Sequence, residues 1–290
     1  MTGFITYHPI VNFVYFLFVI GFSVFFMHPV CLILSLICGL IYLYILNGIT
    51  KQNLLLICFM LLAPAVINPL FNHEGATVIS YLPSQNPLTL ESVLYGLASS
   101  AMLTSVMIWF ICFGRVMESD KLMYLFGKTA PSLALVFSMT LKFIPDFYDK
   151  LRKIAFARRA SGEAHGGIIQ KAKNALCILS VMLTWSLESS IESSNSMKSR
   201  GYSLTGRSFY SIYTFKKRDG LALSAICLFG LYTLYAQSKG AVYFSYFPYI
   251  KYEASAISIS AFISYFALLA IPVAAELWED IKWNNLKSKI

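Results

Sequence analysis

Charged residues are scarce in this 290-residue chain, and its first fifty residues contain no Asp, Glu, Lys or Arg. Charged residues make up 13% of the sequence, whereas hydrophobic residues make up 57%. A soluble domain carries charge on about a quarter of its residues, while a bilayer penalises charge. The composition therefore excludes an ordinary soluble domain and predicts an all-α, polytopic membrane protein.

Closely spaced metal ligands are also missing. The six cysteines form no C-x-x-C pair, and none of the four histidines has a second histidine three or four residues later. Because tight metal binding needs several convergent ligands, we expect no metal site, and a structural loop role for His73 and Glu74 rather than ligation. The cysteines are typical of small buried apolar residues.

Catalytic and nucleotide-binding patterns are absent as well. No Ser/His/Asp set and no paired acids in an apolar segment suggest a catalytic centre, so we expect a chain that is not an enzyme and holds no cofactor. Gly127-Lys128-Thr129 resembles the tail of a phosphate-binding loop, but Leu122 stands where that loop needs glycine. ATP would have to be handled by another polypeptide.

Long apolar segments predict about six membrane-spanning helices, with 1–114 and 220–290 as the transmembrane parts. The segments are Ile10–Met27, Val30–Leu46, Leu54–Ile67, Ser92–Phe113, Leu221–Tyr235 and Ala254–Ala275. About 20 residues cross the hydrocarbon core, so several of them are short. Pro64 leaves open a break or a half-insertion in the third. The loop 68–90 contains three prolines, which favours irregular, exposed structure.

Positive charge is concentrated between the two apolar parts. Residues 115–218 hold 17 of the 23 Lys and Arg residues and 7 of the 14 acids, a net charge of +10. Cytoplasmic loops collect Lys and Arg, so 115–219 is predicted to be a cytoplasmic domain, with both termini cytoplasmic in a cell membrane. The alternative is a patch attracted to anionic lipid. We expect no nucleic-acid partner.

Two amphipathic helices are predicted inside this basic block. No proline or glycine interrupts 168–200, and its apolar residues recur on one helical face. That stripe includes Leu176, Leu179, Leu183 and Leu187. The serine-rich second half would allow another helix to approach closely. The second stretch is Pro131–Lys153, in which Pro145 favours a kink or a helix start.

Whether part of the block crosses the membrane stays open. Its apolar runs Leu133–Leu141 and Leu176–Leu187 are nine and twelve residues long and are flanked by charge, so they are too short to cross. Two extra crossings would nevertheless leave both termini on the same side.

Arginine stands at the predicted end of each amphipathic helix. Ser199-Arg200-Gly201 ends the longer one, where glycine can adopt the left-handed conformation and the helix dipole favours a cation. Arg158-Arg159-Ala160-Ser161-Gly162 forms a comparable end. The two ends suit a two-point contact with a two-fold partner. The alternative is a plain helix cap with a solvated arginine.

At these residues the chain resembles the T component of energy-coupling factor (ECF) transporters. The resemblance is carried by Leu141–Pro145, the helix end at 157–162, Ser196–Tyr202, Asn68–Gly75, Pro87–Glu91 and Gly206-Arg207. It covers residues 60 to 220, and the Ser-Arg-Gly-Tyr helix end is its most specific part.

The resemblance implies a non-catalytic scaffold of a vitamin or metal-ion importer, with a membrane part and a cytoplasmic coupling domain of crossed amphipathic helices. It implies contacts with two cytoplasmic ABC-type ATPase subunits through Ser199, Arg200 and Gly201 and through the end at 158–162. The apolar faces would hold a small membrane-embedded substrate-binding subunit. In the first motif, the family's arginine position falls on Ser161, followed by Gly162, with Arg158 and Arg159 shortly before it. Either one of these arginines takes that role, for which we choose Arg159, or this contact is weaker here.

Two other classes of function compete with this interpretation. A stand-alone secondary transporter or channel needs ionisable residues facing a pathway inside its spans, and the predicted spans have almost none. A membrane-embedded transferase would need paired acids or histidines near a lipid interface.

Overall fold

The computed structural model describes residues 3–81, 87–161, 167–202, 213–247, 249, 251–252 and 255–287. The chain divides into two compact units, one of Met1–Leu122 with Tyr213–Ile290 and one of Met123–Ile212. The assignment of one unit to the membrane and the other to the cytoplasm stays a prediction. The domain boundaries at 115 and 219 also stay predictions.

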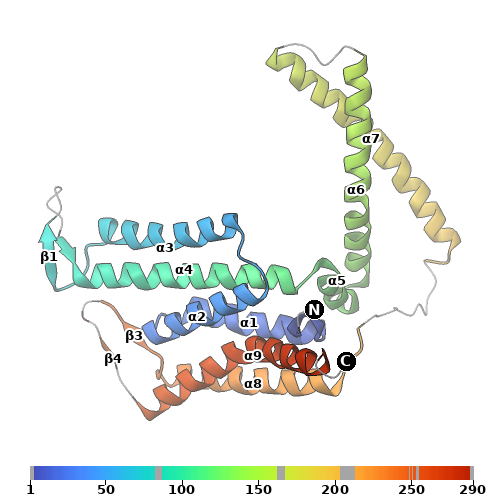
Figure 1. The fold of residues 1–290 in the computed structure, drawn as a ribbon. Helices are drawn as coiled ribbons and strands as arrows, with labels where there is room; N and C mark the ends of the chain where they lie inside the picture. The colour runs from blue at the N-terminus through green and yellow to red at the C-terminus, as the bar shows by residue number, and fades with distance from the viewer. Residues whose placement is uncertain are drawn as a thin grey trace. The chain divides into compact units, whose positions relative to one another are not determined.

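Helices dominate both units, which confirms the all-α prediction (Figure 1). The first unit contains a 3₁₀ turn, Phe4–Thr6, and the helices α1 (Pro9–Phe25), α2 (Pro29–Ile45), α3 (Lys51–Phe71), α4 (Leu90–Val116), α8 (Lys217–Ser238) and α9 (Ala256–Lys287). Helix α5 (Ser119–Thr129) leads from the first unit into the second, which contains α6 (Pro131–Ala160) and α7 (Ile168–Ser199).

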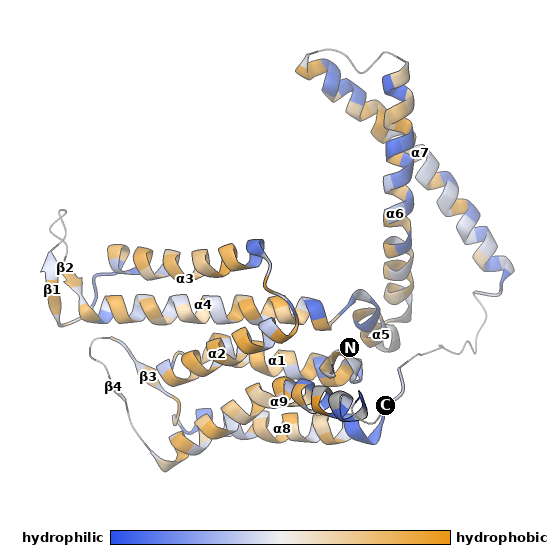
Figure 2. Ribbon diagram, in the orientation of Figure 1, coloured by the Kyte–Doolittle hydropathy of each residue, from blue (hydrophilic) through white to orange (hydrophobic). Residues whose placement is uncertain are grey.

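Each of the six predicted apolar segments falls mainly within one helix, and the chain is a multi-pass membrane protein. Among the described residues, five helices are long and apolar enough to cross a bilayer: α3, α4, α7, α8 and α9. Helices α1 and α2 are apolar and 17 residues long. Helix α3 continues through Pro64, so it is not broken there. Figure 2 shows hydrophobic residues along the first unit's helices and hydrophilic residues interleaved on α6 and α7.

Helix α4 packs against α1, α2 and α3 in the first unit. Trp109 on α4 is fully buried between Tyr15 and Tyr42, with ring centroids 6.2 and 6.3 Å away. Its indole N–H donates to Ser35 Oγ at 2.9 Å, and Ser35 also pairs with Ser105 at 2.8 Å. Hydroxyl bridges of this kind join apolar helices where water is absent.

The loop predicted to be irregular instead contains a hairpin. Strand β1 (Val78–Tyr81) pairs antiparallel with β2 (Pro87–Thr89), and a second small pair, β3 (Phe244–Ser245) with β4 (Lys251–Tyr252), follows α8. Thr77 donates its N–H and, at 2.7 Å, its hydroxyl to the buried carboxylate of Glu91. Gly75 has φ +137°, and a Cβ there would lie 2.6 Å from the same carboxylate. Two segments of the resemblance, 68–75 and 87–91, therefore meet here.

Helices α1 and α2 begin in the same way, with a histidine followed by proline. His8 Nδ1 accepts the N–H of Ile10 at 3.3 Å, and His28 Nδ1 accepts the N–H of Val30 at 3.2 Å. Proline at the first helical position needs no such partner because it has no N–H. Each neutral imidazole therefore acts as the N-cap of a 17-residue apolar helix.

Acidification from about pH 7.5 to about pH 5.5 should destabilise the protein through these two caps. Burial lowers the pKa of His8 and of His28 below 6.5, although Asp219 raises that of His8 in part. Their stabilising contribution is complete above pH 6.5 and is lost as the pH falls through the lowered folded-state pKa, where Nδ1 becomes a donor. Each lost cap costs about 1 kcal/mol, or about 2–4 °C in melting temperature.

The matched control is the double variant His8→Asn, His28→Asn, because asparagine caps helices without titrating. Thermal unfolding in mild detergent should then depend less on pH. An equally steep dependence in the double variant would assign the effect to other groups.

Candidate coupling site

Helices α6 and α7 cross as a pair in the second unit, as Figure 1 shows, and this confirms the predicted crossed amphipathic helices. Near the C-terminal end of α6, the guanidinium of Arg158 donates to Asn174 Oδ1 and, at 2.7 Å, to Cys177 Sγ. Farther along, Phe147 packs edge-on against Trp185 with ring centroids 5.5 Å apart. These contacts hold the pair together by polar bonds at one end and by aromatic packing in the middle.

Helix α6 runs from Pro131 through Pro145 to Ala160, so no new helix starts at this proline. Proline removes the N–H that would bond to residue 141 and weakens the helix locally. Phe143 and Phe147 flank it and stack with centroids 6.0 Å apart, and Phe147 is held by Trp185. Packing of Phe147 on α7 therefore supports the helix just beyond the proline.

The predicted leucine stripe of α7 faces away from α6. Its four members are 54–67% exposed: Leu176, Leu179, Leu183 and Leu187. The side of α7 that contacts α6 carries Asn174, Cys177 and Trp185 instead. Large contiguous apolar surface left uncovered marks a contact with another protein or with lipid. The helix pair thus leaves the stripe available to a partner.

The C-terminal end of α7 has the geometry that the sequence predicts. Gly201 adopts φ +76° and donates its N–H to Lys198 O at 3.0 Å, and Tyr202 donates to Met197 O at 3.1 Å. This pair of bonds is the Schellman motif, which closes a helix through a left-handed residue. Arg200 precedes the glycine and is exposed; its backbone N–H donates to Ser196 O and Met197 O, whereas its side chain makes no hydrogen bond or ion pair with another described residue. Its guanidinium is therefore presented at a fixed helix end.

Replacing Gly201 by alanine should weaken any complex that uses this end. A side chain with positive φ costs about 1–2 kcal/mol, so the last turn would fray and Arg200 would lose its fixed position. We expect about tenfold weaker binding of a partner that docks on this helix end. Gly201→Asn should restore binding in part because asparagine tolerates this conformation. Gly167→Ala, which has open space at the other end of α7, is the control; an equal loss there would contradict a local effect.

The two arginines of the first motif differ in their surroundings. Arg158 is half-buried and bound to α7, whereas Arg159 is exposed. Ser161 is exposed, and its hydroxyl donates a hydrogen bond to Ala157 O at 3.1 Å. Gly162 lies outside the described residues, as does Gly206-Arg207. Of the two arginines, Arg159 is the one whose side chain is accessible to another protein.

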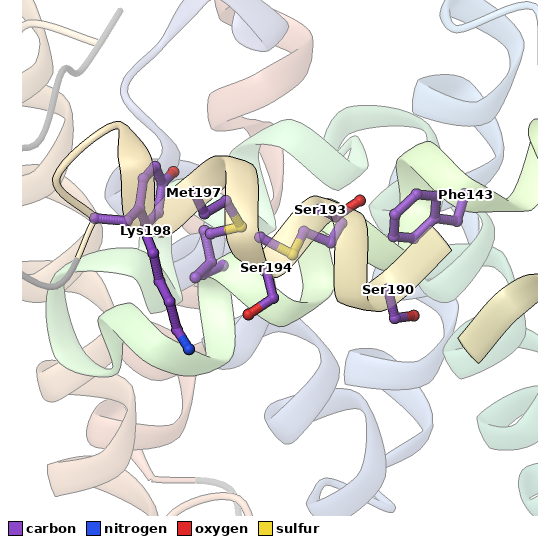
Figure 3. Close-up of a pocket in the computed structure, with 9 residues that line it drawn as sticks. Phe143, Ser190, Ser193, Ser194, Met197 and Lys198 are labelled. Atoms are coloured by element: carbon purple, nitrogen blue, oxygen red, sulfur yellow. The ribbon is translucent and has the colours of Figure 1, made fainter. Parts of the chain in front are cut away.

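A pocket of about 370 Å³ opens between α6 and α7 near Tyr202 (Figure 3). It is lined by Leu135, Met139, Phe143, Ser190, Ser193, Ser194, Met197, Lys198 and Tyr202. The close helix approach predicted for the serine-rich half of α7 is therefore not made by α6 at these serines. The two helices separate toward the Arg200 end.

Some contacts of the site have no counterpart in the sequence analysis. Lys150 Nζ lies 4.8 Å from the ring centre of Trp185, and Met182 is buried. An aromatic residue inside a serine-rich segment is the signal that could have marked this second face of α7. As for metal binding, no cluster of three or more His, Cys, Asp or Glu residues occurs in the described part of the chain.

Comparison with known proteins gives a family and several relatives. A family model described as CbiQ, cobalt transport protein, matches residues 3–210. Three relatives are named energy-coupling factor transporter transmembrane protein EcfT. That of Lactobacillus helveticus is 35% identical over 40% of this chain and 43% of its own length. That of Streptococcus thermophilus is 31% identical over 41% and 46%, and that of Leuconostoc gelidum subsp. gasicomitatum is 29% identical over 34% and 38%. The chain thus spans less than half the length of these relatives.

Proposed function

Because the chain belongs to the CbiQ cobalt transport protein family, we propose that it is the transmembrane scaffold subunit of an energy-coupling factor importer. In this proposal it couples ATP hydrolysis by two cytoplasmic ABC-type ATPase subunits to the movement of a small substrate-binding membrane subunit. The cargo would be a vitamin or a metal ion. The names of the EcfT relatives support the proposal.

The observation that carries the proposal is the end of α7. A Schellman turn fixes the backbone on both sides of an exposed arginine, so little backbone order has to be gained on binding. The planar guanidinium can bond to a carboxylate through two parallel hydrogen bonds. Such an end is suited to a matching groove on an ATPase, with Ser199 and Gly201 beside Arg200.

The end of α6 supplies the second ATPase contact, with Arg159 as the contacting cation and Ser161 and Gly162 beside it. Arg158 has another task, since its guanidinium bonds to Asn174 and Cys177 on α7. In this division of labour Arg158 sets the spacing of the two helix ends and Arg159 enters the second groove.

The uncovered leucine stripe supplies the contact with the substrate-binding subunit. Four leucines on one side of α7 form an apolar strip along about three turns, and α6 does not cover them. In this proposal α6 and α7 lie at the cytoplasmic face of the bilayer rather than across it, and both termini are cytoplasmic. The most apolar stretch of α7 is less hydrophobic than that of each of the other four candidate spans.

Hydrolysis belongs to the partner chains in this proposal. Gly127 and Lys128 lie within α5, a helix rather than a phosphate-binding loop. The stand-alone transporter is not favoured, because the buried charged side chains of the described chain bond to backbone groups near helix ends and loops rather than lining a pathway. These side chains are Glu91, Lys121, Asp219 and Glu276.

The test is purification in mild detergent followed by reconstitution. The chain should retain two ATPase subunits and one small membrane subunit, and the complex should take up that subunit's ligand only with ATP. Uptake by the chain alone, without ATP, would overturn the proposal. Labelling of a single cysteine at position 200 from outside intact cells would overturn the proposed topology.

A further inference from the structure

The segment Gly3–His8 lies at a junction of the first unit and bonds to three separate helices. Phe4, which is fully buried, packs its ring against Tyr15 and Tyr42 at 5.2 and 6.4 Å. The backbone N–H groups of Gly3 and Phe4 donate to the carboxylate of Glu276 on α9 at 2.6 and 3.2 Å. Backbone amides that meet a buried carboxylate make strong, charge-assisted bonds.

Lys121 ties the same segment to the start of α5. Its ammonium donates to Ile5 O at 2.7 Å and to Val116 O, at the end of α4, at 2.8 Å. The residue is 5% exposed, and burial lowers the pKa of its ammonium while Glu118 raises it. A buried ammonium is costly unless carbonyls or anions surround it, so this contact has a defined geometry rather than that of a mobile surface lysine.

A third connection joins the segment to the start of α8. Asp219 is 2% exposed and accepts the N–H groups of His8 and Lys216, at 3.4 and 2.9 Å. Arg218 donates to Thr6 Oγ1 at 3.1 Å, lies over the ring of Tyr7 at 4.3 Å, and pairs with Glu279 of α9 at 3.4 Å.

These bonds lie close to the two points at which the chain passes between the two units. The chain leaves the first unit after Leu122 and returns to it at Tyr213. Lys121 directly precedes the first passage, and Lys216–Asp219 directly follows the second. Both connections to α6 and α7 are therefore bonded to one six-residue segment, which is itself bonded to α9.

We propose that Gly3–His8 is the anchor through which movement of the coupling helices reaches the membrane helices, with Lys121 as its positioning residue. The inference rests on the proposed function. A displacement of α6 and α7 pulls on the chain at 122 and 213, and a firm anchor there transmits it to α1, α8 and α9. With a loose anchor, the displacement is absorbed by the connections.

The test uses the complete complex in liposomes and measures substrate taken up per ATP hydrolysed. Lys121→Met keeps the aliphatic stem but removes both donated bonds. It should lower this ratio at least about fivefold, with co-purified ATPase and its hydrolysis rate within about twofold of wild type. Lys121→Arg, which retains donors, should recover part of the ratio. Lys51→Met, at an exposed lysine of the same unit, should leave it unchanged.

Glu276→Gln is the second variant, since it perturbs the anchor from α9 without touching Lys121. An amide offers only one accepting oxygen to the two N–H groups, so the ratio should fall here too, and this variant decides the matter if Lys121→Met does not assemble. An unchanged ratio in the variants that assemble, or a loss explained by lost ATPase, overturns the anchor. If the wild-type complex shows no ATP-driven uptake, the proposed function itself fails.

Discussion

Replacing Arg200 by glutamate should abolish ATP-driven uptake while the chain remains inserted in the membrane. The substitution reverses the charge of an exposed side chain at the closed end of α7 and breaks no described contact within the chain. If this guanidinium meets a carboxylate in an ATPase groove, reversal places two carboxylates together. Disrupting a desolvated charge pair costs about 2–5 kcal/mol. We therefore expect the ATPases to bind at least about thirtyfold more weakly.

The matched control is Lys171→Glu, which makes the same change of charge at an exposed position near the other end of α7. Binding of purified ATPase subunits to the detergent-solubilised scaffold measures both variants, and uptake in cells measures the consequence. Equal losses in the two variants would assign the effect to the overall positive charge of the unit. Unchanged binding and uptake for Arg200→Glu would remove Arg200 from the coupling site.

The end of α7 was predictable because its signals are local. A stretch free of proline and glycine predicts a helix over 168–200, and the helix covers Ile168–Ser199 with Gly201 at positive φ. The exposed leucine stripe follows from the same helical periodicity. Each of these features is specified by residues that are close together in the sequence, so no knowledge of the rest of the fold is needed.

Helix α6 shows where local signals fail. Pro145 predicts a kink or a helix start, yet no helix starts there, because α6 already begins at Pro131 and continues through Pro145, beyond which Phe147 packs on Trp185 of another helix. The choice between Arg158 and Arg159 likewise depends on the rotation of α6 against α7. If α6 were rotated about its axis by one residue position, the other guanidinium would reach Asn174. The rotation of the helix therefore decides which arginine binds α7 and which one stays exposed.

The contacts at Gly3–His8 could not be predicted at all. Lys121 and Ile5 are 116 positions apart, and Gly3 and Glu276 are 273 apart. Nothing in the spacing of these residues indicates a bond. In the sequence the first residues are the start of an apolar run, and the acidic residues near 276 belong to a charged tail. Only the packing of α1, α8 and α9 brings them together.

Replacing Leu183 by aspartate should release the substrate-binding subunit and leave the ATPases bound. Leu183 is 57% exposed in the middle of the stripe, so the isolated chain has little to lose from the change. In a complex that covers it, burial of the leucine contributes about 1.5–3 kcal/mol, and the new carboxylate would also have to be desolvated. We expect at least about tenfold weaker retention of the small subunit.

Thr184→Asp tests whether the position of the new charge matters. Thr184 is the next residue along α7; it is exposed and lies off the leucine stripe. Adding a carboxylate there should therefore leave the small subunit bound. Quantitative mass spectrometry of the purified complexes would measure both partners together. Loss of only the ATPases from Leu183→Asp would mean that the stripe faces them instead, and the assignment of the two partners to the faces of α7 would have to be reversed. A loss of the small subunit that is equal in both variants would show that charge anywhere along α7 disrupts it, because an apolar contact limited to the stripe cannot respond to a carboxylate that it does not bury.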